Sequence, residues 1–154
     1  MSNSQPLIRA RSSIGDTAVD GLLYGVVAGI VMAIYLIVMG VLTGTGLVAT
    51  LSAFDLGQGT SPMRGVLIHL AVSAIYGMAF SLIYRLIGRR RSIGRGGSVI
   101  IGLVYGLLMW LIAQIAFAAG VNVALSSLST VHFAVAHAVY GATLGWLAGR
   151  TRTE

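Results

Sequence analysis

With 56% hydrophobic residues and 9% charged residues in a chain of 154, the sequence is far from the roughly 25% charged residues of soluble domains, which excludes a water-soluble domain or a disordered tail. Cysteine is absent, which excludes disulfides, thiolate metal sites and catalytic cysteines. The net charge of +6 does not indicate nucleic-acid binding, because the arginines flank apolar segments and are placed to attract anionic lipid headgroups.

Four segments are long and apolar enough to cross a bilayer, which takes about 20 residues of helix. In chain order they cover residues 21–42, 63–86, 98–119 and 130–148. Residues 1–20 form a polar segment before the first span, and residues 150–154 form a tail after the last. We expect the apolar stretch 47–54 to lie along the membrane interface. The sequence therefore predicts an all-α membrane protein, with residues 21–149 forming a bundle of four transmembrane helices.

The arginines predict how this bundle is oriented. Arg9 and Arg11 precede the first span, five more surround the connection between the second and third spans, and Arg150 and Arg152 follow the fourth. Arg64 alone lies on the other side. Because positive residues favour the cytoplasmic side, both termini are expected in the cytoplasm and the protein in the inner membrane. The first span is too long for a cleavable signal peptide and is expected to stay as an anchor.

A Tyr-Gly pair occurs once in each span. The four pairs are Tyr24-Gly25, Tyr76-Gly77, Tyr105-Gly106 and Tyr140-Gly141. The first and third spans share the longer pattern Gly-Leu-x-Tyr-Gly. These matches predict two tandem helical hairpins with the same orientation, that is, a parallel internal repeat.

Small residues recur at every fourth position within the spans, which places them along one face of each helix. The members of this set are Gly21, Gly25, Gly29, Ser73, Gly77, Gly102, Gly106, Gly141, Gly145 and Gly149. Such stripes let helix backbones approach closely in a bilayer. Internal helix packing is the favoured interpretation, and a pore lining or a docking face for a partner helix is the alternative.

Three polar side chains continue these stripes in the outer half of the spans: His69, Gln114 and His137. We expect them to converge between the second, third and fourth helices. They fit a structural hydrogen-bond network, a haem b site with His69 and His137 as axial ligands, or a pocket for a quinone or another small ligand. His132 lies nearly opposite Gly141 around its helix, so it is expected to face lipid headgroups or a partner.

The remaining sequence signals argue against catalysis. Phosphate loops, nucleophile elbows and zinc-protease motifs are absent, so no catalytic or metal-binding residue is predicted. No carboxylate lies inside a span, which argues against ion-coupled transport. Because the loops are short, the sequence predicts a non-catalytic accessory or structural subunit that packs against other membrane subunits, or a second copy, through its glycine-rich faces. A haem- or quinone-binding redox subunit that uses His69 and His137 is one alternative, and a small channel or transporter is another.

The segments that begin at His69 and His137 carry a family resemblance. They read His-Leu-Ala-Val-Ser-Ala-Ile-Tyr-Gly and His-Ala-Val-Tyr-Gly-Ala-Thr-Leu-Gly. With the two Tyr-Gly hairpins, they resemble small uncharacterised four-span membrane proteins of prokaryotes, over roughly residues 18–149. The resemblance implies a compact helical bundle and carries over no activity and no functional residue.

Overall fold

The computed structural model describes residues 13–55, 61–88, 93–121 and 129–150. Within these ranges it contains the helices α1 (Ile14–Leu42), α2 (Leu47–Ala53), α3 (Pro62–Gly88), α4 (Arg95–Ala118) and α6 (Thr130–Arg150). The helices α1, α3, α4 and α6 are long and apolar enough to cross a membrane, which confirms the prediction of an all-helical chain with four candidate spans. Most of the arginines used to predict the orientation, among them Arg9, Arg11 and Arg152, lie outside the described residues.

The helix α1 begins at Ile14, ahead of the apolar span expected from residue 21, because a polar first turn is stabilised by capping. The Asp16 N–H donates to Oγ of Ser13 over 3.0 Å, and the Ser13 N–H donates to the Asp16 carboxylate over 2.7 Å. This reciprocal pair is a capping box. Arg85 of α3 reaches the same turn and donates to the Ser13 carbonyl over 2.6 Å and to the Thr17 hydroxyl over 2.5 Å. The polar ends of α1 and α3 are thereby joined.

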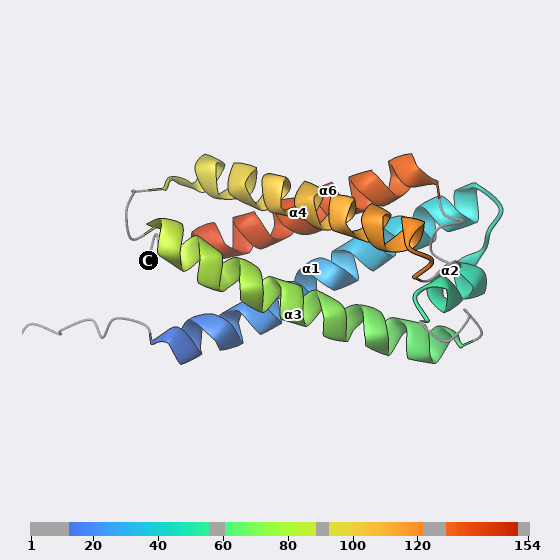
Figure 1. Cartoon of the computed structure of the whole chain (residues 1–154), viewed down its shortest axis with the longest axis horizontal. Helices are drawn as coiled ribbons and strands as arrows, with labels where there is room; N and C mark the ends of the chain where they lie inside the picture. Colours follow the sequence, from blue (N-terminus) through green and yellow to red (C-terminus); the bar gives the residue numbers. More distant parts are fainter. Residues whose placement is uncertain (1–12, 56–60, 89–92, 122–128, 151–154) are drawn as a thin grey trace, which may run out of the picture.

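The long helices pack mainly in two pairs (Figure 1). The helix α1 lies along α3, and α4 lies along α6. Contacts between α1 and α6 join the two pairs, whereas α3 and α4 make few contacts although they follow one another in the chain. The start of α1 and the end of α6 lie at the same end of the bundle, opposite α2. An even number of long helices returns the chain to the end at which it started.

Both pairs are packed backbone against backbone. A Cβ atom built on Gly25 of α1 would lie 3.0 Å from the Cα of Gly77 in α3, and one built on Gly106 of α4 would lie 3.1 Å from the Cα of Gly141 in α6. The glycines of the four Tyr-Gly pairs thus meet two by two. All the predicted packing residues lie at contacts between helices of this chain. A Cβ atom at any of these four Tyr-Gly glycines would collide with backbone atoms of the facing helix, so glycine permits the close approach.

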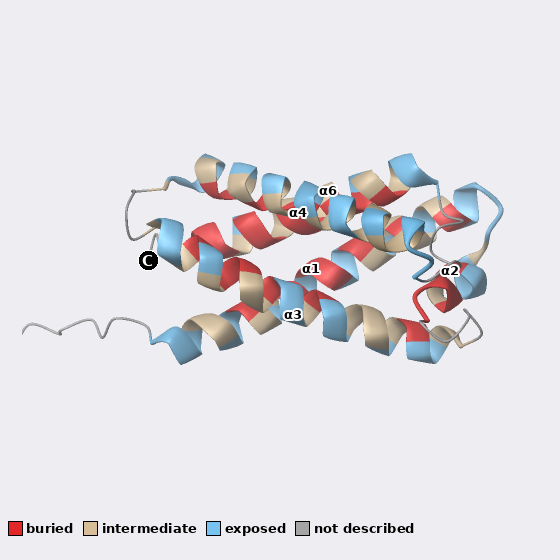
Figure 2. Ribbon diagram, viewed as in Figure 1, coloured by how far each residue is buried: buried red, intermediate tan, exposed pale blue. Residues whose placement is uncertain are grey.

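Three tyrosine hydroxyls connect the α4–α6 pair to α3. The hydroxyl of Tyr84 in α3 lies 2.6 Å from Oγ of Ser98 in α4. The Tyr105 hydroxyl donates to the Tyr76 carbonyl over 2.8 Å, and the Tyr140 hydroxyl donates to the Ser73 carbonyl over 2.7 Å. Figure 2 shows the buried residues on the helix faces that turn toward the bundle interior. Large apolar side chains cover the outside, including Ile115, which is 71% exposed. An apolar exterior around a small-residue interior is typical of helices packed within lipid.

The apolar stretch expected at the interface forms α2, which packs against α1 and α3 at the end of the bundle opposite the start of α1. An ion pair closes this end. Asp55, the second residue after α2, is 1% exposed, and its carboxylate lies 3.0 Å from the Arg64 guanidinium at the start of α3. The same carboxylate accepts a hydrogen bond from the Ser61 N–H over 3.2 Å. The arginine that stands apart in the charge pattern therefore joins α3 to the α2 segment.

Candidate functional site

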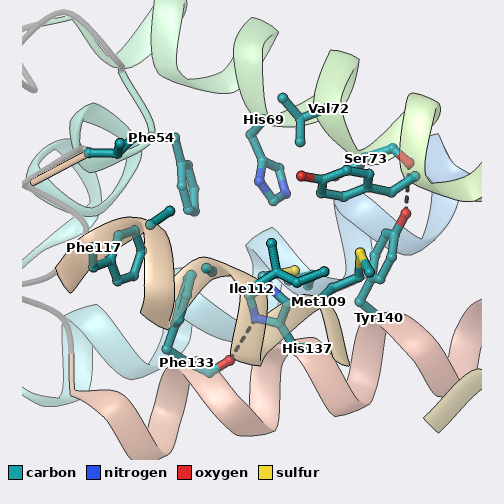
Figure 3. Close-up of a pocket in the computed structure, with 15 residues that line it drawn as sticks. Phe54, His69, Val72, Ser73, Met109, Ile112, Phe117, Phe133, His137 and Tyr140 are labelled. Carbon is teal, nitrogen blue, oxygen red and sulfur yellow. Dashed lines mark hydrogen bonds between the residues drawn. The ribbon is translucent and has the colours of Figure 1, made fainter. Parts of the chain in front are cut away.

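A cavity of about 220 Å³ lies within the bundle, and side chains from all four long helices line it. Figure 3 shows α3 along one side of the cavity and α6 along the opposite side. Its polar groups come mainly from these two helices: His69, Ser73 and Tyr76 from α3, and His137 and Tyr140 from α6. Aliphatic and aromatic side chains make up the rest of the wall. A mostly apolar hollow with a few convergent polar groups is the usual form of a small-molecule site.

His69 is held in place by α1 and by the residue that follows α2. Its Nε2 lies 3.0 Å from the Gly29 carbonyl oxygen, and its ring stacks on Phe54 with 4.4 Å between centroids and 24° between planes. Gly29 is needed for the packing of α1 on α3, because a Cβ there would lie 2.6 Å from Cβ and Oγ of Ser73, next to His69 on the same face of α3. The imidazole is therefore fixed on two sides.

His137 is fixed by the preceding turn of its own helix. Its Nδ1 lies 2.9 Å from the Phe133 carbonyl oxygen, and the two rings meet edge to face with 4.5 Å between centroids. The Phe133 ring in turn contacts Phe117 of α4 over 5.4 Å between centroids. His137 is 9% exposed, so this ring lies deep in the bundle. The aromatic contacts leave its orientation little freedom.

Two of the three residues expected to converge do come together. His69 and His137 point toward one another across the cavity from α3 and α6 (Figure 3). Gln114 is half-buried on α4 and does not line the cavity. His132, expected to face lipid or a partner, is half-buried, and its Nδ1 lies 3.3 Å from the Tyr35 hydroxyl of α1.

Several aromatic residues of the wall are not among the site residues that the sequence predicts, although Tyr140 belongs to a Tyr-Gly pair. Phe133 and Tyr140 stand four residues before and three residues after His137, so helical spacing alone places them on its face. That signal was available. Phe54 reaches His69 because α2 docks against α3, and no periodicity within either segment indicates that contact.

Of the four exposed residues that line the cavity, three flank the seam between α3 and α4, which indicates an opening there, and the fourth is Val121. At the seam, Val72 and Tyr76 of α3 are each 39% exposed, and Ile112 of α4 is 52% exposed. Since α3 and α4 make few contacts, the opening follows the seam between them. A molecule would therefore reach the two histidines from the side of the bundle.

Haem b binding by His69 and His137 stays a prediction, and the volume of the cavity favours a smaller ligand. A cavity of about 150 Å³ in a protein core binds benzene, so about 220 Å³ suits one ring with small substituents and not a tetrapyrrole. Each histidine places one ring nitrogen against a backbone carbonyl oxygen, which leaves the other nitrogen of the ring for a ligand. Among the described residues, no group of three or more His, Asp or Glu side chains is placed to hold a metal ion.

Comparison with known proteins gives a family and no activity. A family model described as a family of unknown function, DUF6789, matches residues 16–154. Neither the curated proteins nor the solved structures contain a match to the chain. A function must therefore be argued from the site itself.

Proposed function

Because the chain belongs to DUF6789, a family of unknown function, we propose a function from the geometry of the cavity. The protein is a four-span membrane protein that binds the single-ring headgroup of a lipid-soluble small molecule and performs no reaction on it. The observation that carries this proposal is a cavity of about 220 Å³ in which His69 and His137 face one another. One ring fits the volume, and the imidazoles supply polar contacts that orient it.

The opening of the cavity specifies where the ligand comes from. In a bilayer, the exposed side chains of Val72 and Ile112 at the seam lie against acyl chains. A headgroup would enter sideways from the membrane, and an attached alkyl tail would remain between α3 and α4. The ligand class is thus an amphiphile with a compact ring, because a water-soluble ion would have to cross hydrocarbon to reach this opening.

The arginine pattern supports an orientation of the site relative to the two sides of the membrane. The start of α1 and the end of α6 lie at the same end of the bundle. We propose that this end faces the cytoplasm, in agreement with two tandem hairpins of the same orientation. Phe54 and Val121, which line the cavity, lie next to the opposite end of the long helices. The binding site would then occupy the outer half of the inner membrane.

The glycine-rich faces favour binding over an accessory-subunit function. Gly25 meets Gly77, and Gly106 meets Gly141, inside the chain. These faces are therefore covered by the chain's own helices and offer little surface to a second subunit. The cavity is the feature of the bundle that internal packing leaves open.

Titration of para-butylphenol into the protein in lipid nanodiscs tests the proposal. Empty nanodiscs measure the partitioning of the probe into lipid, and we expect saturable binding above that background. Ala113→Leu adds bulk to the cavity wall and should abolish this binding. Ala118→Leu adds the same bulk at an exposed position of the same helix that does not line the cavity, and should leave binding intact. Equal binding by the Ala113→Leu variant and the unchanged protein would refute the site.

A further inference from the structure

The hydrogen bonds of the two histidines determine which ring nitrogens remain for a ligand. Nε2 of His69 lies 3.0 Å from the Gly29 carbonyl oxygen. A carbonyl oxygen only accepts, so this nitrogen carries the proton and donates it. In the neutral ring the other nitrogen, Nδ1, is then an acceptor.

His137 has the opposite tautomer and the same outcome. Its Nδ1 lies 2.9 Å from the Phe133 carbonyl oxygen, so Nδ1 carries the proton and Nε2 is the acceptor. No Asp or Glu of the described part of the chain lines the cavity. A buried imidazolium without a carboxylate partner is costly, so we treat both rings as neutral. Each histidine therefore has an acceptor nitrogen left for a ligand.

The other polar groups of the cavity do not reverse this balance. The Tyr140 hydroxyl already donates its proton to the Ser73 carbonyl over 2.7 Å. The hydroxyls of Ser73 and Tyr76 can donate or accept, according to the ligand. The two groups with a fixed character are the imidazole nitrogens, and both lack a proton. A ligand that satisfies them must bring donors of its own.

We propose that the cavity selects a hydroxylated ring, such as a phenol or the reduced hydroquinone form of a quinone, over the matching ether or quinone. This inference rests on the proposed binding function and specifies its ligand. A hydroxyl group donates to Nδ1 of His69 or to Nε2 of His137. A quinone carbonyl or an ether oxygen turned toward these nitrogens sets acceptor against acceptor and leaves both unsatisfied in an apolar surrounding.

The test compares pairs of probes in which one member has hydroxyl donors and the other has none, on the unchanged protein in nanodiscs. Butylhydroquinone is titrated without oxygen beside butylbenzoquinone, and para-butylphenol beside para-butylanisole. We expect the hydroxylated member of each pair to bind about tenfold more tightly, the range of one or two hydrogen bonds. Equal affinity within both pairs, or tighter binding of the quinone and the ether, overturns the inference.

Variants assign the preference to the histidines. His69→Phe and His137→Phe keep an aromatic ring in the wall and should each reduce the preference for the hydroxylated probe. His132→Phe is the matched control, because His132 contacts Tyr35 and does not line the cavity. A preference that survives both cavity variants would contradict the assignment.

The outcomes separate this inference from the proposed function. If all probes bind equally and Ala113→Leu abolishes their binding, the cavity is a ligand site and the donor preference is wrong. If no probe binds above empty nanodiscs, the proposed function itself is wrong and the inference falls with it.

Discussion

Replacing Gly141 with alanine tests whether the bundle depends on contact between backbones. A Cβ at this position would fall on the Gly102 carbonyl oxygen and would lie 2.9 Å from the Gly102 carbonyl carbon and from the Gly106 nitrogen. All three neighbours are backbone atoms of α4, so no side chain can rotate away. The helices α4 and α6 must move apart to admit the methyl group.

The size of the effect follows from these distances. Ordinary contact with a Cβ begins near 3.4 Å, so the atoms at 2.9 Å must retreat by at least 0.5 Å. A radial gap of about 0.5–1 Å removes a quarter to a half of the dispersion energy of each separated contact. Overpacking of a well-packed core costs about 1–3 kcal/mol. We expect Gly141→Ala at the upper end of that range, because neither helix has a side chain that can yield.

Equilibrium unfolding of the protein from mixed micelles, followed by far-UV circular dichroism, measures this loss. Gly96→Ala is the matched control: it makes the same change in α4 at a glycine whose Cβ would meet nothing within 4 Å. We expect the control to be neutral or slightly stabilising, since alanine favours helix over glycine. Equal stability of the two variants would refute the close-packing argument.

Three further outcomes are expected. Tyr140→Phe removes the 2.7 Å hydrogen bond to an α3 carbonyl and should lower the free energy of unfolding by about 0.6–1.7 kcal/mol in the same assay; a larger loss would indicate a different role for this hydroxyl. Arg64→Gln breaks the 3.0 Å ion pair with the buried Asp55 and should lower the free energy of unfolding by about 1 kcal/mol. This value is small for a buried carboxylate because the arginine is 59% exposed. No loss would show that the pair does not stabilise the α2 end. Since the chain lacks cysteine, Val48→Cys and Gly96→Cys report orientation: an impermeant maleimide should label the first in intact spheroplasts and the second only after lysis, and the reverse pattern would invert the predicted orientation.

The sequence is most informative about the long helices. In lipid the backbone must satisfy its own hydrogen bonds, so runs of about 20 apolar residues suffice to predict helix despite many glycines and β-branched residues. The four helices confirm this. Hydropathy predicts the first span from residue 21, whereas α1 begins at Ile14 because its polar first turn is capped. The spacing of Ser13 and Asp16 is that of a capping box and indicates this earlier start. The duplication of a Tyr-Gly hairpin and the cytoplasmic termini stay predictions.

The site was harder to predict, because its parts come from segments far apart in the chain. His69 and His137 could be singled out as polar residues on small-residue faces, but the same reasoning included Gln114, which does not line the cavity. Ala113, the residue before Gln114 on α4, does line the cavity. Spacing fixes a helix face to within about 100°, and neighbouring positions on a helix differ by that angle. The packing of α2, which brings Phe54 to His69, has no local signature at all.

The contacts among the long helices are uneven, so the bundle consists of two tightly packed pairs with a weaker junction between them. The two pairs, α1 with α3 and α4 with α6, meet where α1 contacts α6, and glycine contacts hold the helices of each pair together. Separating α3 from α4 would break the hydrogen bonds of Tyr84, Tyr105 and Tyr140, while the glycine contacts within each pair would stay in place. The junction of α3 with the α4–α6 pair is thus held by side-chain hydrogen bonds, whereas each pair is held by contact between backbones.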